Sequence, residues 1–229
     1  MLKRHNLLFL NSNKNIETDD LLMEIGKEKQ DILSHLKSEA FGITIPGIVK
    51  RQQNVKETQK IEVGFSTHLY HDGSRIRING NVLESDIDKV VTPFDISDEI
   101  MKNSRTEPFY KKEKQLKEII QVGNKMGFSI GVFGSLALQW ITGLTYCNEN
   151  SDLDLYIQKK DQEAEVEKFS IFLSEIEKQE KMHIDAELEY QNKFGECYGI
   201  KLKEYVSKQH TVIAKGLYTI EVFMKEYIN

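Results

Sequence analysis

The chain has few cysteines and lacks long hydrophobic runs. Cys147 and Cys197 are its only cysteines, and they form neither a disulfide framework nor the closely spaced ligand pairs of a zinc site. The first apolar run, Leu7–Leu10, is too short for a signal peptide, and no later run is long enough to span a membrane. We therefore expect a cytoplasmic protein without a membrane partner.

An excess of positive charge is also missing. The 31 lysines and arginines stand against 36 aspartates and glutamates, and the formal net charge of −5 argues against a nucleic-acid partner. The sequence contains no G-x-x-x-x-G-K-[ST] phosphate loop, no G-x-G-x-x-G, no H-E-x-x-H and no G-x-S-x-G. These absences argue against the enzyme classes that those motifs mark.

A predicted strand-to-helix corner at Gly134 and Ser135 opens the most informative stretch of the chain. The apolar run 128–133, FSIGVF, predicts a buried strand, and a helix is expected from about Leu136 with Ser135 as its cap. Glycine lets the backbone approach a ligand closely, and unpaired N–H groups at the start of a helix suit phosphate. The corner therefore indicates a phosphate-binding site.

Two aspartates follow after a polar loop. The run 151–157, SDLDLYI, predicts a strand that carries Asp152 and Asp154 on one face, with their Cα atoms roughly 6–7 Å apart. Both carboxylates could then reach one divalent metal ion, and without a cation their repulsion should raise at least one pKa. Either motif alone is common on solvated loops. In this order and spacing they favour a nucleotidyltransferase-type site.

A third carboxylate is expected from the run 183–190, HIDAELEY, which alternates apolar and acidic residues. If this strand lies beside the Asp152 strand, Asp185 or Glu187 can help to bind the metal or accept a proton from an attacking hydroxyl. The alternative is a strand whose acidic face is merely solvated. The pattern alone does not decide between them.

Strand and helix patterns alternate along the whole chain, which predicts an α+β fold. Residues 85–108 are charged and hold two of the three prolines, so we interpret them as the connection between two domains, 1–90 and 105–229. The expected strands are 3–10, 61–70, 75–78, 128–133, 151–157, 183–190, 195–202 and 218–224, and the expected helices are 21–40, 109–126 and 161–181.

Several segments together resemble a known family. The most specific are Gly134-Ser135, Ala137-Leu138-Gln139, Thr142-Gly143-Leu144 with Tyr146, and Ser151-Asp152-Leu153-Asp154-Leu155. Weaker similarity lies in Arg4-His5-Asn6, Ile48-Val49-Lys50-Arg51, Asp185-Ala186-Glu187 and Val212-Ile213-Ala214-Lys215. The chain resembles the malonate decarboxylase holo-acyl-carrier-protein synthases, which are phosphoribosyl-dephospho-CoA transferases related to the nucleotidyltransferase superfamily.

The resemblance implies a nucleotidyltransferase-like catalytic domain at 105–229, a mixed sheet flanked by helices. It also implies a smaller α+β domain at 1–90 that recognises substrate or carrier, with Lys50, Arg51, Arg75 and Arg77 as its expected polar contacts. The implied reaction transfers phosphoribosyl-dephospho-CoA from 2′-(5″-triphosphoribosyl)-3′-dephospho-CoA to a serine of the apo acyl carrier protein subunit of malonate decarboxylase. Pyrophosphate is released.

The resemblance also implies roles for single residues. Asp152, Asp154 and Asp185 would be catalytic and would bind Mg²⁺ or Mn²⁺, whereas Gly134 and Ser135 would bind substrate phosphates. Lys201, Lys203 and Lys215 lie near the ends of the last predicted strands and are candidates for balancing phosphate charge. Among these lysines, the resemblance implies the phosphate-binding role for Lys215. Two alternatives remain open: transfer of a nucleoside monophosphate from ATP or CTP to another hydroxyl, and a non-catalytic binding module. The presence of the Gly-Ser pair with both aspartates favours catalysis.

Overall fold

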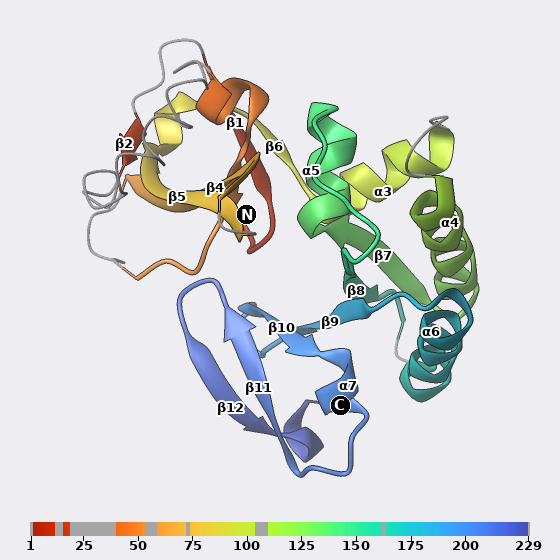
Figure 1. Cartoon of the computed structure of the whole chain (residues 1–229). Helices are drawn as coiled ribbons and strands as arrows, with labels where there is room; N and C mark the ends of the chain where they lie inside the picture. The colour runs from red at the N-terminus through yellow and green to blue at the C-terminus, as the bar shows by residue number, and fades with distance from the viewer. Residues whose placement is uncertain are drawn as a thin grey trace. The chain divides into compact units, whose positions relative to one another are not determined.

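The computed structural model describes residues 2–11, 16–18, 40–53, 59–71, 74–103, 110–161 and 164–228. Within these residues the chain divides into two compact units, Met1–Thr92 and Pro93–Asn229. Each unit contains a six-stranded sheet (Figure 1). The combination of helices and sheets confirms the predicted α+β class.

The sheet of Met1–Thr92 is antiparallel, with the strand order β2-β5-β4-β3-β1-β6. Along β5, buried Ile76 and Ile78 alternate with Arg75 and Arg77, so one face packs into the core and the other carries the two arginines. The predicted helix 21–40 lies almost entirely outside the described residues. The elements are β1 (Leu7–Leu10), β2 (Ile16–Thr18), η1 (Ala40–Thr44), β3 (Gly47–Val49), β4 (Lys60–His71), β5 (Ser74–Leu83), η2 (Glu84–Asp86) and β6 (Ile87–Val91).

The sheet of Pro93–Asn229 is mixed, with the order β12-β11-β10-β9-β8-β7. Only the β8–β9 pair is parallel among the described strands of this sheet. Its strands are β7 (Phe128–Phe133), β8 (Leu153–Lys159), β9 (Ile184–Gln191), β10 (Cys197–Lys201), β11 (Thr211–Gly216) and β12 (Ile220–Met224). Its helices are α3 (Pro93–Lys102), α4 (Tyr110–Lys125), α5 (Gly134–Thr142), α6 (Val166–Glu180), α7 (Leu202–Tyr205) and η3 (Lys225–Tyr227).

Helices cover both faces of β7 and β8. On one face α4 and α6 pack on the sheet, and Phe128 of β7 stacks on Phe169 of α6 with ring centroids 4.9 Å apart. On the other face α3 and α5 pack on β7 and β8, and α3 comes so close that a Cβ on Gly131 would meet Pro93 at 2.7 Å. The mixed sheet flanked by helices was predicted for this part of the chain.

Several boundaries differ from the prediction. The described part of the predicted connection, residues 85–103, contains β6 and α3, and the two units meet within it between Thr92 and Pro93. Helix α5 begins at Gly134 with Phe133 as its N-cap residue, so Ser135 lies inside the first turn and does not cap the helix. β8 begins at Leu153, which leaves Asp152 just before the strand, and β11 was not predicted as a strand.

Candidate active site

The corner between β7 and α5 holds the carboxylate of Asp154. Gly134 has φ 69°, and a Cβ at this position would overlap Asp154 Oδ2, so only glycine fits without displacing the aspartate. The backbone N–H of Ser135 donates a hydrogen bond to the Asp154 carboxylate. The first turn of α5 therefore orients the second aspartate of the Asp-x-Asp pair.

Asp154 and Asp185 lie side by side. They are direct partners in the parallel β8–β9 register, and Phe133 pairs with Asp154 on the other side. Neighbouring strands are about 4.8 Å apart, so the two carboxylates share one stretch of the sheet face. Burial, followed by the negative charges of Asp185 and Asp152, raises the pKa of Asp154 to about 6.

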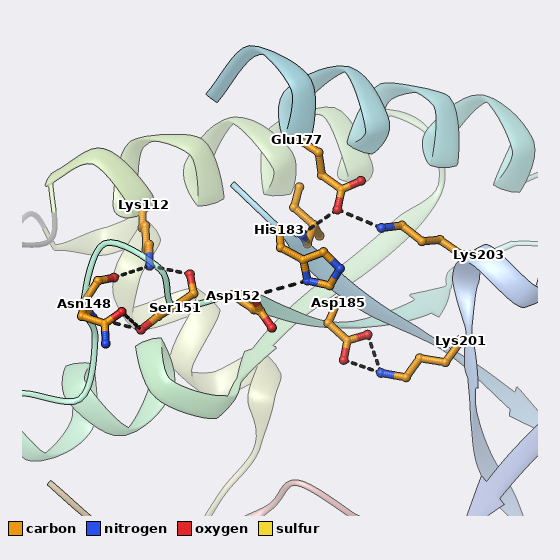
Figure 2. Close-up of polar contacts among 10 residues, drawn as sticks. Lys112, Asn148, Ser151, Asp152, Glu177, His183, Asp185, Lys201 and Lys203 are labelled. Carbon is orange, nitrogen blue, oxygen red and sulfur yellow. Dashed lines mark hydrogen bonds and ion pairs between the residues drawn. The ribbon is translucent and has the colours of Figure 1, made fainter. Parts of the chain in front are cut away.

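Asp185 has a lysine as its counter-ion. Both of its carboxylate oxygens contact Lys201 Nζ (Figure 2). The same ammonium lies 3.9 Å from Glu187 Oε1. Lys201 is the last residue of β10 and pairs directly with Glu187 of β9. The β9–β10 register therefore places a positive charge against the third aspartate.

Asp152 is more exposed than its two neighbours in the site. Half of its side chain is accessible, and Oδ1 lies 3.4 Å from Nδ1 of His183, the residue before β9 (Figure 2). Asp152 lies just before the first residue of β8, at the end of a loop that turns at Asn148–Ser151. Its position therefore depends on the contacts that hold this loop.

Two side chains that the chemical analysis of the sequence did not single out hold that loop. Gln139 of α5 is buried, and its Oε1 accepts hydrogen bonds from the backbone N–H groups of Tyr146 and Cys147. Lys112 of α4 donates from Nζ to the backbone oxygens of Asn148 at 2.9 Å and Ser151 at 2.6 Å. Gln139 entered only as part of the resemblance, and no local pattern marks Lys112.

Lys215 is not close to the three aspartates. It pairs with Gly199 of β10, which pairs with Glu189 of β9, so Lys215 is level with Glu189 rather than with Asp185. At about 3.3 Å per residue this is roughly 13 Å farther along the strands, and two strands away. Lys201 is the lysine that contacts Asp185, and the phosphate-binding role of Lys215 stays a prediction.

The implied magnesium ion agrees with the donor chemistry of the site. Asp152 and Asp154 offer hard carboxylate oxygens. Burial and then the repulsion of the neighbouring aspartates raise the pKa of Asp154, and a cation would relieve that repulsion. Among the described residues, His, Cys, Asp and Glu side chains form no group of three that could hold an ion by themselves. Two carboxylates completed by substrate phosphates are a usual arrangement for Mg²⁺.

Comparison with known proteins decides the family. The model of the phosphoribosyl-dephospho-CoA transferase MdcG C-terminal domain matches residues 100–226, more than half of the 229 residues. The chain belongs to this family. No curated protein and no solved structure matches the chain.

Membership of the MdcG family makes the chain a transferase, as the resemblance implied. The matched residues contain all of α4 to α7 and β7 to β12. The family match therefore covers every residue predicted to be catalytic or phosphate-binding: Gly134, Ser135, Asp152, Asp154, Asp185 and Lys215. No helix in the described part of the chain is long and apolar enough to cross a membrane. The roles of the individual site residues are taken up as proposals below.

Proposed function

We propose that the protein transfers phosphoribosyl-dephospho-CoA from 2′-(5″-triphosphoribosyl)-3′-dephospho-CoA to a serine of the apo acyl carrier protein subunit of malonate decarboxylase. The observation that carries the proposal is the position of Asp154. Its carboxylate accepts a hydrogen bond from the backbone N–H of Ser135, and Asp154 pairs directly with Asp185 in the β8–β9 register. A helix start and adjacent carboxylates are the groups that phosphoryl transfer requires.

The reaction joins the carrier and the prosthetic group through a phosphodiester. The serine Oγ forms a bond to the phosphorus that is attached to the ribose, the bond from this phosphorus to pyrophosphate breaks, and the serine loses its proton to a base. Gly134 and Ser135 would lie at the pyrophosphate end of the donor, because the start of α5 attracts anions.

The carboxylates supply the second part of the proposed mechanism. Asp152 and Asp154 would hold Mg²⁺, which when bound neutralises negative charge on the reacting and leaving phosphates. Ser135 and Gly134 fix the orientation of Asp154 before substrate arrives. Positioning and charge neutralisation are the main contributions of a protein to this kind of reaction.

We also propose that Met1–Thr92 recognises the donor or the carrier through a basic face. Arg75 and Arg77 share one face of β5, and Lys50 donates to Asn79 of that face at 2.8 Å. Arg77→Ala should raise KM for the donor about fivefold, the loss expected for one charge-assisted hydrogen bond to phosphate. Lys89→Ala on β6 is the control, and unchanged kinetics of the arginine variant would contradict this role.

The test of the main proposal is the intact mass of the apo carrier subunit after incubation with this protein, Mg²⁺ and the triphosphoribosyl donor. A mass gain equal to phosphoribosyl-dephospho-CoA is expected, and it should be lost with Asp154→Ala and with EDTA. No gain with folded protein and competent carrier would contradict the proposal. A nucleotide panel with pyrophosphate detection would then test transfer from ATP or CTP.

A further inference from the structure

We infer that Lys201 is a phosphate-binding catalytic residue of the site and that Asp185 positions its ammonium instead of serving as a metal ligand. The inference rests on the proposed function, because it assigns two residues to that transfer reaction. It gives Asp185 a different role from the one expected from the sequence, and it supplies the site with a positive charge of its own.

The contacts of Asp185 support this assignment. Lys201 Nζ contacts both carboxylate oxygens of Asp185, so one ammonium occupies the side of the carboxylate that a metal ion would use. Glu187 is buried and lies 3.9 Å from the same ammonium. Contacts with two carboxylates hold the ammonium of Lys201 in a defined place.

The Asp185–Lys201 pair is accessible to a ligand. The side chain of Asp185 is 31% exposed and that of Lys201 is 29% exposed, and both line a pocket beside α6. The Lys201 charge also acts on Asp154, where it opposes the increase in pKa caused by burial and by the neighbouring aspartates. A phosphate group bound at Asp154 would therefore be within the electrostatic influence of the Lys201 ammonium.

The other lysines near the site are engaged elsewhere. Lys203 donates to Glu177 of α6 at 2.8 Å, and Lys112 donates to the backbone of the loop before Asp152 (Figure 2). Lys215 is level with Glu189 two strands away. Of the lysines whose contacts the structure describes, Lys201 is the one that contacts a predicted catalytic aspartate.

The chemical consequence is a division of labour between the two sides of the site. Asp152 and Asp154 would hold the metal ion, and Lys201 donates charge-assisted hydrogen bonds to the phosphate oxygens as the bond to pyrophosphate breaks. Asp185 and Glu187 hold the ammonium until the donor arrives. The serine attacks and pyrophosphate leaves as in the reaction proposed above.

The first test measures Mn²⁺ binding by titration calorimetry, in the absence of donor and carrier. Asp154→Asn should weaken Mn²⁺ binding at least 30-fold, whereas Asp185→Asn should leave it within threefold of the wild type. Lys201→Met should bind Mn²⁺ equally well or a few-fold more tightly, because it removes a nearby positive charge. A loss of Mn²⁺ binding in Asp185→Asn as large as in Asp154→Asn would overturn the inference.

The second test measures the rate of carrier modification. Lys201→Met should lower kcat about 100-fold, the usual effect of removing one group that stabilises transition-state charge. Adding Asp185→Asn to Lys201→Met should cost little more, because the two residues act as a unit. Lys203→Met is the matched control and should stay within twofold. A kcat for Lys201→Met near the wild-type value, or additive effects in the double variant, would overturn the inference.

The two tests separate this inference from the proposed function. If the wild type modifies no carrier but the Mn²⁺ pattern holds, the proposed function fails and the metal-ligand assignment survives. If the carrier is modified but Lys201→Met is as active as the wild type, the proposed function stands and the inference fails. Circular dichroism of each variant excludes loss of folding as the cause of a lower rate.

Discussion

Asp154 and Asp185 are direct neighbours on parallel strands, yet their surroundings differ in charge. Asp154 lies against two other aspartates and accepts one backbone N–H, from Ser135, and its pKa is raised to about 6. Asp185 has Lys201 against both of its oxygens. The same residue type at the same height in the sheet therefore has two different environments: Asp154 lies in negative surroundings that a bound cation would relieve, whereas Asp185 already contacts a cation of the chain.

The largest effect on the rate is expected from removing the negative charge of Asp154, the aspartate that lies beside other aspartates. Asp154→Asn should reduce carrier modification at least 1000-fold, because the site loses the carboxylate to which both the helix start and the metal are directed. The measurement is the initial rate at saturating Mg²⁺. Asp98→Asn, an exposed aspartate of α3, should keep the wild-type rate. A residual activity above one tenth in Asp154→Asn would show that Asp154 is not essential.

Adding a methyl group at Gly134, in the corner between β7 and α5, tests the surroundings of Asp154 without removing a charge. Gly134→Ala should lower the rate about 100-fold and the free energy of unfolding by about 2 kcal/mol, because φ is 69° and the new Cβ would overlap Asp154 Oδ2. Gly143→Ala is the matched control, since φ is 73° but no atom lies within 4 Å of its Cβ. It should cost about 1 kcal/mol and leave the rate unchanged. Equal rates for the two variants would contradict the role given to Gly134.

The strand that carries Asp154 and the Gly-Ser corner beside it are the parts of the site that local sequence patterns could predict. The alternation around Asp154 and the Gly-Ser corner depend on residues that are close in the sequence, and a period of two fixes the face of a strand. The partners of Asp185 were harder to predict, because the β8–β9 and β9–β10 registers join segments that are far apart. The strand pattern offered Lys201, Lys203 and Lys215 alike for the phosphate role and the resemblance selected Lys215, whereas the sheet order brings Lys201 to Asp185.

One missed element did have a local signal. Pro93 lies in the segment predicted to connect two domains, and it is the first residue of α3, a position that proline favours because the N–H it lacks has no partner inside the helix there. Ile96 and Ile100 are four residues apart and both are buried, which is the spacing of a helix that packs on a core. β6 gave a weaker signal, because three of its five residues are exposed.

A smaller effect is expected from loosening the loop that carries Asp152. Gln139→Leu keeps the side chain similar in size but makes it apolar, and so removes the Oε1 that accepts from the N–H groups of Tyr146 and Cys147. We expect a loss of about 1–3 kcal/mol of stability, and about tenfold weaker Mn²⁺ binding as Asp152 loses its position. Gln121→Leu on the exposed side of α4 is the control for both measurements. Unchanged Mn²⁺ binding would mean that Asp152 does not depend on Gln139.

The last expected effect is the pH dependence of stability, which tests the charge environment of Asp154 without substrate. The pKa of Asp154 is about 6 in the folded chain against 3.8 for the ordinary group, so the folded state binds the proton more tightly. Without metal, this one group should lower the free energy of unfolding as pH rises from about 4 to 6, by on the order of 2 kcal/mol after allowing for solvent screening. Asp154→Asn should lack this decrease and be more stable than the wild type at pH 7. Mg²⁺ should then stabilise the wild type and not the variant. Denaturant unfolding at several pH values measures both effects. The same dependence of the free energy of unfolding on pH in both proteins would show that Asp154 does not destabilise the folded chain when it ionises.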